Sequence, residues 1–131
     1  MPGDLRQHYL DYLAVLNERR FDDLVDFVAE GLTYNGRAIT RADYQQSRRE
    51  EVLAIPDLRF EVGLLVVEDE RVACRLEFDC TPEGTFLGFE PPGGRVRFAE
   101  HVFYRFADGL IVEVTSLVDR EAIRLQLGDP G

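Results

Sequence analysis

The hydrophobic pattern of the chain changes its period near residue 57, and this change limits the fold more than any other feature. Before it, apolar residues recur at three- and four-residue intervals, which is typical of amphipathic helices. After it, apolar and polar residues alternate, which is typical of half-buried strands. The alternating runs are residues 58–67, 71–81, 94–106 and 109–118. Because strands joined by short turns must be antiparallel, this half predicts an antiparallel meander.

The helical half predicts three helices. The first has Asp4 as its cap and a stripe of apolar residues: Leu5, Tyr9, Tyr12, Leu13 and Leu16. A short second helix is expected from Phe21 to Val28, ending near Gly31. The third follows Thr40, whose spacing from Asp43 suggests a capping box, and Pro56 stops it. Between them, Leu32 to Gly36 is a short strand or crossing segment with an Asn-Gly turn.

The third helix also carries four consecutive charged residues: Arg48, Arg49, Glu50 and Glu51. Mixed charges at this spacing predict a solvated face. A last short helix is expected from Asp119 to Leu127. The order of elements therefore predicts an α+β domain with a curved antiparallel sheet and helices packed on one face.

Size and charge restrict the domain count and the partners. A chain of 131 residues with 45% hydrophobic content fits one domain, residues 1–131. A net charge of -10 repels nucleic acid and anionic membrane surfaces. The first twenty residues carry six charges, and the chain lacks an apolar run of about 18 residues, so we expect a soluble, cytoplasmic protein.

The cysteines and histidines do not suggest a disulfide or a metal site. Cys74 and Cys80 are six residues apart in one predicted strand, about 20 Å at 3.3 Å per residue, too far for a disulfide. With only His8 and His101, and no zinc-ligand spacing, a zinc site lacks ligands. Gly-rich phosphate loops are missing as well, so we expect no cofactor.

Strand alternation sorts the side chains into two faces. One face of residues 94–106 is apolar except for Glu100 and Tyr104. The matching faces of the neighbouring strands carry Val72, Cys74, Leu76, Phe78 and Cys80, and then Val112, Val114, Ser116 and Val118. We assign these faces to an apolar pocket. A carboxylate there must find a donor or an arginine, or hold its proton more readily, so Glu100 is the candidate acid–base group.

The stretch from Thr81 to Asp119, followed by IRLQLG, resembles SnoaL-like polyketide cyclases and related ester cyclases. Its matching motifs are TPEGTFLG, a Pro-Gly turn, a VRF strand and YRFADGLI. The resemblance implies the cone of the nuclear transport factor 2-like fold. It also implies a homodimer, formed through the outer face of the sheet.

In that family, proton transfer is assigned to an Asp on the last strand and a His on the strand before it. These positions correspond to Ser116 and Val102, so both charged groups are missing and Glu100 is the remaining substitute. The arginines Arg75 and Arg97 are expected to face away from the pocket, and His101 to lie on the outer face.

The sequence leaves two functions open. One is a cofactor-independent cyclase, isomerase or hydrolase acting on a small hydrophobic ligand, with Glu100 moving a proton. The other is a dimeric binding module that has lost the cyclase acid–base pair. The expected substrate-binding residues are Tyr12, Tyr34, Phe78, Val102, Tyr104 and Ser116. The segment with Phe86, Leu87 and Phe89 either closes over a ligand or plugs the mouth of the cone.

Overall fold

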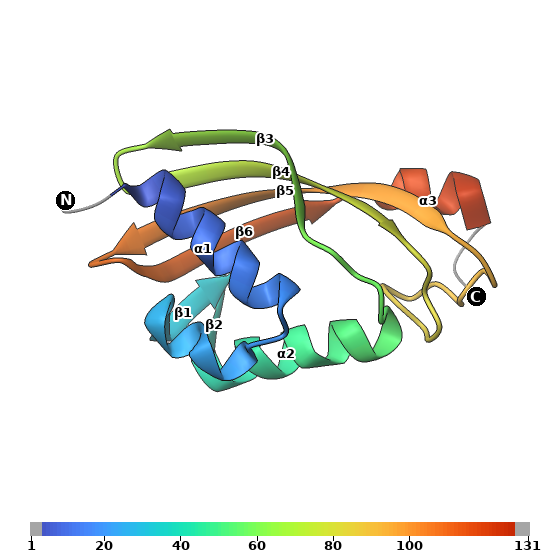
Figure 1. Ribbon diagram of the computed structural model, residues 1–131, viewed down its shortest axis with the longest axis horizontal. Coiled ribbons are helices and arrows are strands. Elements are labelled where there is room, and N and C mark those ends of the chain that lie inside the picture. The colour runs from blue at the N-terminus through green and yellow to red at the C-terminus, as the bar shows by residue number, and fades with distance from the viewer. Residues whose placement is uncertain (1–3, 128–131) are drawn as a thin grey trace.

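The computed structural model describes residues 4–127, and it confirms the α+β class. Its elements are α1 (Leu5–Asn17), η1 (Phe21–Asp26), β1 (Val28–Tyr34), β2 (Arg37–Thr40), α2 (Arg41–Ala54), β3 (Glu61–Glu68), β4 (Arg71–Cys80), β5 (Val96–Ala107), β6 (Leu110–Val118) and α3 (Arg120–Leu127). Six strands form one sheet in the order β2-β1-β6-β5-β4-β3. Figure 1 shows α1 and α2 covering one side of this curved sheet, with α3 beyond the end of β6.

The sheet is mixed, whereas the sequence predicted an antiparallel one. The meander from β3 to β6 is antiparallel, but β1 runs parallel to β6. The chain between β1 and β6 contains α2 and four strands, so no tight turn determines their relative direction.

The predicted second helix, Phe21 to Val28, is present as a 3-10 helix but ends two residues early. A 3-10 helix covers Phe21–Asp26, and β1 begins at Val28, so Gly31 lies inside a strand. The pairing with β6 explains the early end, because Ile111 donates its backbone N–H to the carbonyl oxygen of Phe27. Strand pairing satisfies backbone groups that a longer helix would have satisfied internally.

The faces of the central strands follow the predicted alternation with one exception. A register shift between Arg105 and Phe106 places Ile111, instead of Val112, opposite Phe106 on the buried face. Val114, Ser116 and Val118 stay on that face because they pair with Tyr104, Val102 and Glu100. Bulges of this kind change which side chains point inward without changing the sequence pattern beyond them.

The core lies between the concave face and the helices. The buried stripe of α1 includes Tyr9 and Tyr12, both with no exposed surface, and Tyr44 from α2 packs beside them. Each such aromatic side chain contributes about 1.5 to 3 kcal/mol through burial. Cys74 and Cys80 are free and buried, as expected. Among the described helices, none is long and apolar enough to cross a membrane.

Two interactions fix the helices on the sheet. The Asn17 side chain at the end of α1 both donates to and accepts from the backbone of Phe60, before β3. The predicted capping box of α2 is present, with Thr40 and Asp43 exchanging side-chain to backbone hydrogen bonds. A side chain that faces the sheet from α2 is therefore held in a defined place.

Candidate functional site

A hollow of about 340 Å³ lies between α2, the segment before β5, and the concave face of the sheet. One part of its lining is apolar: Ala54, Ile55, Leu58, Phe60, Phe78, Phe86, Leu87, Phe98 and Val118. The other part is polar: Tyr34, Ser47, Arg48, Glu50, Glu51, Thr85 and Glu100. The hollow is therefore more charged than the sequence predicted.

Glu100 lies in the middle of β5 and faces this hollow. The hydroxyl of Ser116, on the neighbouring strand β6, donates a hydrogen bond to its Oε2. Among the described residues, none forms an ion pair with Glu100. Of the alternatives that the sequence left open, the structure thus supplies a donor. A carboxylate held by one hydroxyl keeps lone pairs free to accept a proton.

Arg48 and Glu51 also face the hollow; the prediction of a solvated face was wrong for Arg48, whereas the Glu51 side chain is still 39% exposed. The side chain of Arg48 is only 13% exposed, and its Nε lies 2.9 Å from Oε1 of Glu51. Tyr44, Arg48 and Glu51 recur at helical spacing on one face of α2, and the buried C-cap Ile55 follows them at the same spacing. This spacing was the missed sequence signal, because two charges stand where a core-facing stripe continues.

Burial and charge act in opposite directions on this pair. Burial raises the pKa of Glu51 above its usual range, the Arg48 charge opposes this, and the Glu100 charge adds to it. For Arg48, burial alone would lower the pKa, but the Glu51 carboxylate outweighs it and the pKa is raised. The two carboxylates are therefore electrostatically coupled across the hollow.

A set of buried phenols lies behind the charged wall. Tyr12 and Tyr44 are hydrogen-bonded through their hydroxyls, and the Tyr9 hydroxyl donates to that of Tyr104 at 3.5 Å. The Arg48 guanidinium lies 4.8 Å from the centroid of the Tyr44 ring. Burial raises the pKa of Tyr44 to about 12, so this phenol stays neutral at physiological pH.

The predicted substrate-binding residues fall into two groups. Tyr34 and Phe78 line the hollow, and Ser116 contacts Glu100. Tyr12, Val102 and Tyr104 are at most 4% exposed and pack behind the lining. Their roles in binding stay predictions.

A second hollow of about 430 Å³ opens beside the first, at the β1–β2 hairpin. Tyr34, Ser47 and Arg48 line both hollows. Arg48 therefore lies at the boundary of the two hollows.

The segment between β4 and β5 closes one side of the first hollow. Its backbone N–H groups at Glu83 and Gly84 donate to the carbonyl oxygen of Ala54, at the end of α2. Phe86 and Phe89 are buried and bridge each other, whereas Leu87 is 43% exposed. Leu87 also has a φ of +52°, a conformation uncommon for a branched side chain.

A third hollow, about 810 Å³, is lined mainly by charged residues and includes the outward-facing Arg75 and Arg97. Its charges are largely paired with each other: Arg95 and Arg97 with Asp79, Arg75 with Glu77, and Arg59 with Glu61. His101 also lies away from the Glu100 hollow, where Arg75 donates to its Nε2 at 2.9 Å. Within residues 4–127, no group of three or more His, Cys, Asp or Glu side chains is arranged to hold a metal ion.

Comparison with known proteins gives one consistent result. The family model for SnoaL-like polyketide cyclases matches residues 6–127. A SnoaL-like polyketide cyclase from Agrobacterium tumefaciens is 43% identical, with 96% of this chain and 99% of that chain covered and a TM-score of 0.92. AclR from Streptomyces galilaeus, for which a hydroxylase activity has been suggested, is 25% identical, with 95% of each chain covered and a TM-score of 0.78.

IdmH from Streptomyces antibioticus shares the fold at 19% identity, with 97% of this chain and all of that chain covered and a TM-score of 0.83. No curated protein matches the chain.

Proposed function

The chain belongs to the family of SnoaL-like polyketide cyclases, and we propose that it is an enzyme that transfers protons on a small, largely apolar substrate beside Glu100. One observation carries this proposal: a carboxylate held by a single hydroxyl faces a hollow with a broad apolar wall. The apolar wall suits the body of such a substrate, and the carboxylate suits its reacting carbon.

The proposed step begins with ionised Glu100 and a carbonyl compound. The carboxylate takes a proton from the carbon next to the carbonyl, and the C–H electron pair moves to the carbonyl oxygen as an enolate. The enolate then regains a proton elsewhere, as in an isomerase, or attacks a second carbonyl group, as in a cyclase. Ser116 keeps the Glu100 carboxylate oriented through its hydroxyl. The step needs no metal or nucleotide.

A second candidate is a binding module without catalysis. It is favoured by Val102, which is 2% exposed and lies directly opposite Ser116 in the β5–β6 register. The family resemblance places a His and an Asp at these two positions, and neither residue here can titrate. A binding module would hold the ligand in the same hollow and leave it unchanged.

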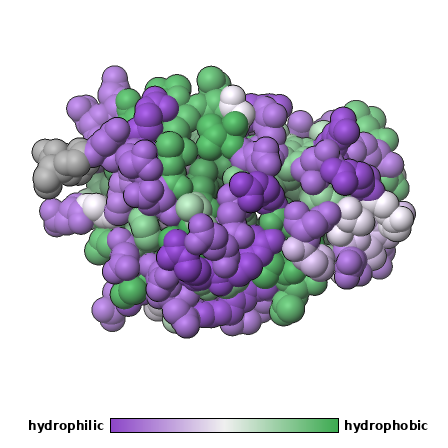
Figure 2. All heavy atoms as spheres, in the orientation of Figure 1, coloured by the Kyte–Doolittle hydropathy of each residue, from purple (hydrophilic) through white to green (hydrophobic). Residues whose placement is uncertain are grey.

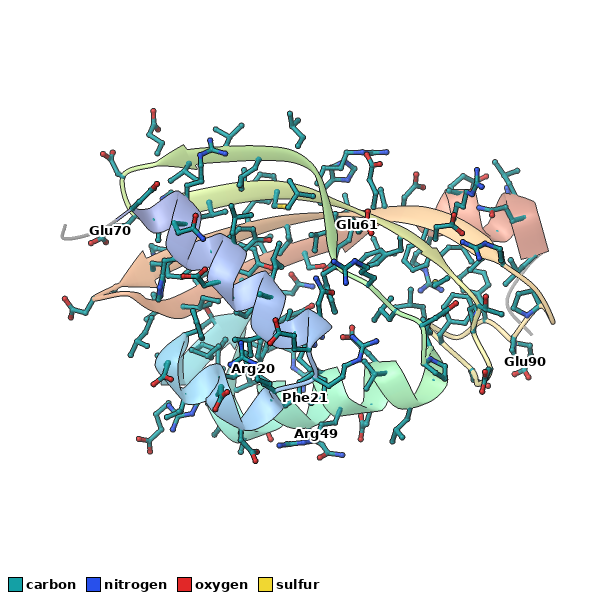
Figure 3. The ribbon with its side chains drawn as sticks, viewed as in Figure 1. Arg20, Phe21, Arg49, Glu61, Glu70 and Glu90 are labelled. Carbon is teal, nitrogen blue, oxygen red and sulfur yellow. The ribbon has the colours of Figure 1, made fainter. Side chains whose placement is uncertain are left out.

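The test is hydrogen–deuterium exchange of a panel of cyclic ketones and esters in D₂O, followed by NMR. We expect exchange catalysed by the native protein and a loss of about 10² to 10⁴-fold in Glu100→Gln. Glu70→Gln is the control, since Figure 3 shows Glu70 at the β3–β4 turn, away from α2. Ligand binding without exchange would support the binding module and contradict the enzyme.

We also propose a homodimer formed through the outer face of the sheet. Phe103 and Leu117 lie on that face and are 55% and 70% exposed, and Leu64 and Val66 from β3 add further apolar surface. An apolar surface that extends from β6 to the edge strand β3 suits a second copy of the same chain, because a twofold axis pairs the patch with itself.

A further inference from the structure

Arg48 is a largely buried charge, and its partner Glu51 is 39% exposed. Figure 3 shows its neighbour Arg49 on the side of α2 away from the sheet, while Arg48 lines the hollow. Burying an ion pair is often no better for stability than burying apolar side chains of similar size. The Arg48–Glu51 pair therefore requires a reason other than folding.

The hydrogen-bonding capacity of Arg48 is largely unused. A guanidinium has five N–H donors, yet no described residue accepts a hydrogen bond from this one. Its Nε lies 2.9 Å from Glu51, but the two atoms are misaligned, so both lack a hydrogen-bond partner. These donors remain available to a molecule in either of the hollows that Arg48 lines.

Arg48 also carries the only positive charge among the residues that line the Glu100 hollow. The carboxylate of Glu51 lies beside it and balances it. When Glu100 takes a proton from a neutral substrate, Glu100 becomes neutral and the substrate becomes the anion. The new negative charge is then best placed near the guanidinium, since burial strengthens such an interaction.

We propose that Arg48 stabilises the negative charge that develops on the substrate oxygen, and that it is a second catalytic residue beside Glu100. This inference rests on the proposed function for its chemistry. In this proposal, the carboxylate of Glu51 holds the Arg48 guanidinium in place beside the hollow. It also orients the substrate, with the reacting carbon toward β5 and the oxygen toward α2.

The test is binding of 2-naphthol, whose ultraviolet absorbance distinguishes the neutral form from the naphtholate. It is done in Glu100→Gln, because this variant imitates protonated Glu100 and cannot take the proton itself. We expect naphtholate to bind at least about tenfold more tightly than naphthol. Adding Arg48→Met should abolish the preference, and adding Arg49→Met, a matched change on the same helix, should retain it.

A double change, Arg48→Met with Glu51→Leu, guards against misfolding because it removes both members of the ion pair and leaves no unpaired charge. Circular dichroism verifies the fold of each variant. The inference is overturned if Glu100→Gln shows no naphtholate preference, or if the preference persists without Arg48. The result is independent of turnover, so Arg48-dependent naphtholate binding without deuterium exchange would contradict the proposed function alone.

Discussion

Two glutamates in the same hollow differ because of their neighbours. Glu100 is held by a neutral hydroxyl from the adjacent strand, whereas Glu51 lies beside a guanidinium on its own helix. Burial disfavours the charged form of a carboxyl group, and neighbouring charges or hydrogen-bond donors oppose or add to this effect. Their different surroundings separate the roles that we propose for them, proton transfer for Glu100 and charge compensation for Glu51.

The raised pKa of Glu51 predicts a specific pH dependence of stability. The folded protein holds the Glu51 proton more tightly than the unfolded chain, whose pKa is near the ordinary 4.5. The stabilisation that comes from protonated Glu51 is therefore complete below pH 4.5 and is lost as pH rises through the raised pKa of Glu51 in the folded protein. Urea unfolding from acidic to neutral pH should show native stability falling relative to Glu51→Gln.

A Glu100→Gln background gives the control for this measurement. The Glu100 charge helps to raise the pKa of Glu51, so removing that charge should reduce the pH dependence of the free energy of unfolding. Native stability that rises with pH relative to Glu51→Gln would contradict the assignment.

The β1–β2 hairpin shows how an element of secondary structure positions the site. Its turn residues Asn35 and Gly36 have φ angles of +49° and +83°, as a tight hairpin turn of this hand requires. Asn35 also accepts a hydrogen bond from the backbone N–H of Ser116 at 2.7 Å. One turn residue therefore connects the hairpin to the strand segment that supports Glu100.

Replacing Asn35 should separate these two contributions. In Asn35→Ala we expect a loss of about 2 kcal/mol in the free energy of unfolding, because the left-handed backbone and the hydrogen bond each cost about 1 kcal/mol. Asn35→Gly tolerates the backbone conformation and should lose only about half as much. Urea unfolding measures both, and equal losses would contradict the separation.

At the scale of the whole molecule, the bent sheet gives its two faces different uses. The concave face is covered by α1 and α2 and contains Glu100, whereas the opposite face of β5 and β6 presents Phe103 and Leu117. Figure 2 shows hydrophilic side chains over most of α2 in the view of the helix-covered side. The proposed dimer contact and the candidate site are therefore on opposite faces.

Changing Phe103 and Leu117 together to glutamate should dissociate the proposed dimer without unfolding the chain. Both side chains are exposed, so the change creates no buried charge. Sedimentation of the native protein at twice the mass of 15.0 kDa, and of the variant at that mass, is the expected result. A native protein that sediments as a monomer would contradict the dimer.

Much of the fold was predictable because it depends on local patterns. Four features each depend on residues that are close in sequence: the change of period, the short turns between strands, the capping box at Thr40 and the Asn-Gly turn. The same alternation placed Glu100 and Ser116 on one face, where the structure has them in contact. Period and turn chemistry thus determined the meander and the face of the candidate site.

Tertiary structure decided the remaining features, each of which depends on contacts distant in sequence. β1 pairs in parallel with β6, and the sequence did not predict this direction because no turn links strands some eighty residues apart. A bulge in the β5–β6 pairing places Ile111, instead of Val112, on the buried face. From the sequence alone, charged side chains on a helix are expected to face solvent, because the surface that packs against the helix is not known. Only the sheet packed against α2 showed that Arg48 and Glu51 face inward, because burial is a property of the assembled fold.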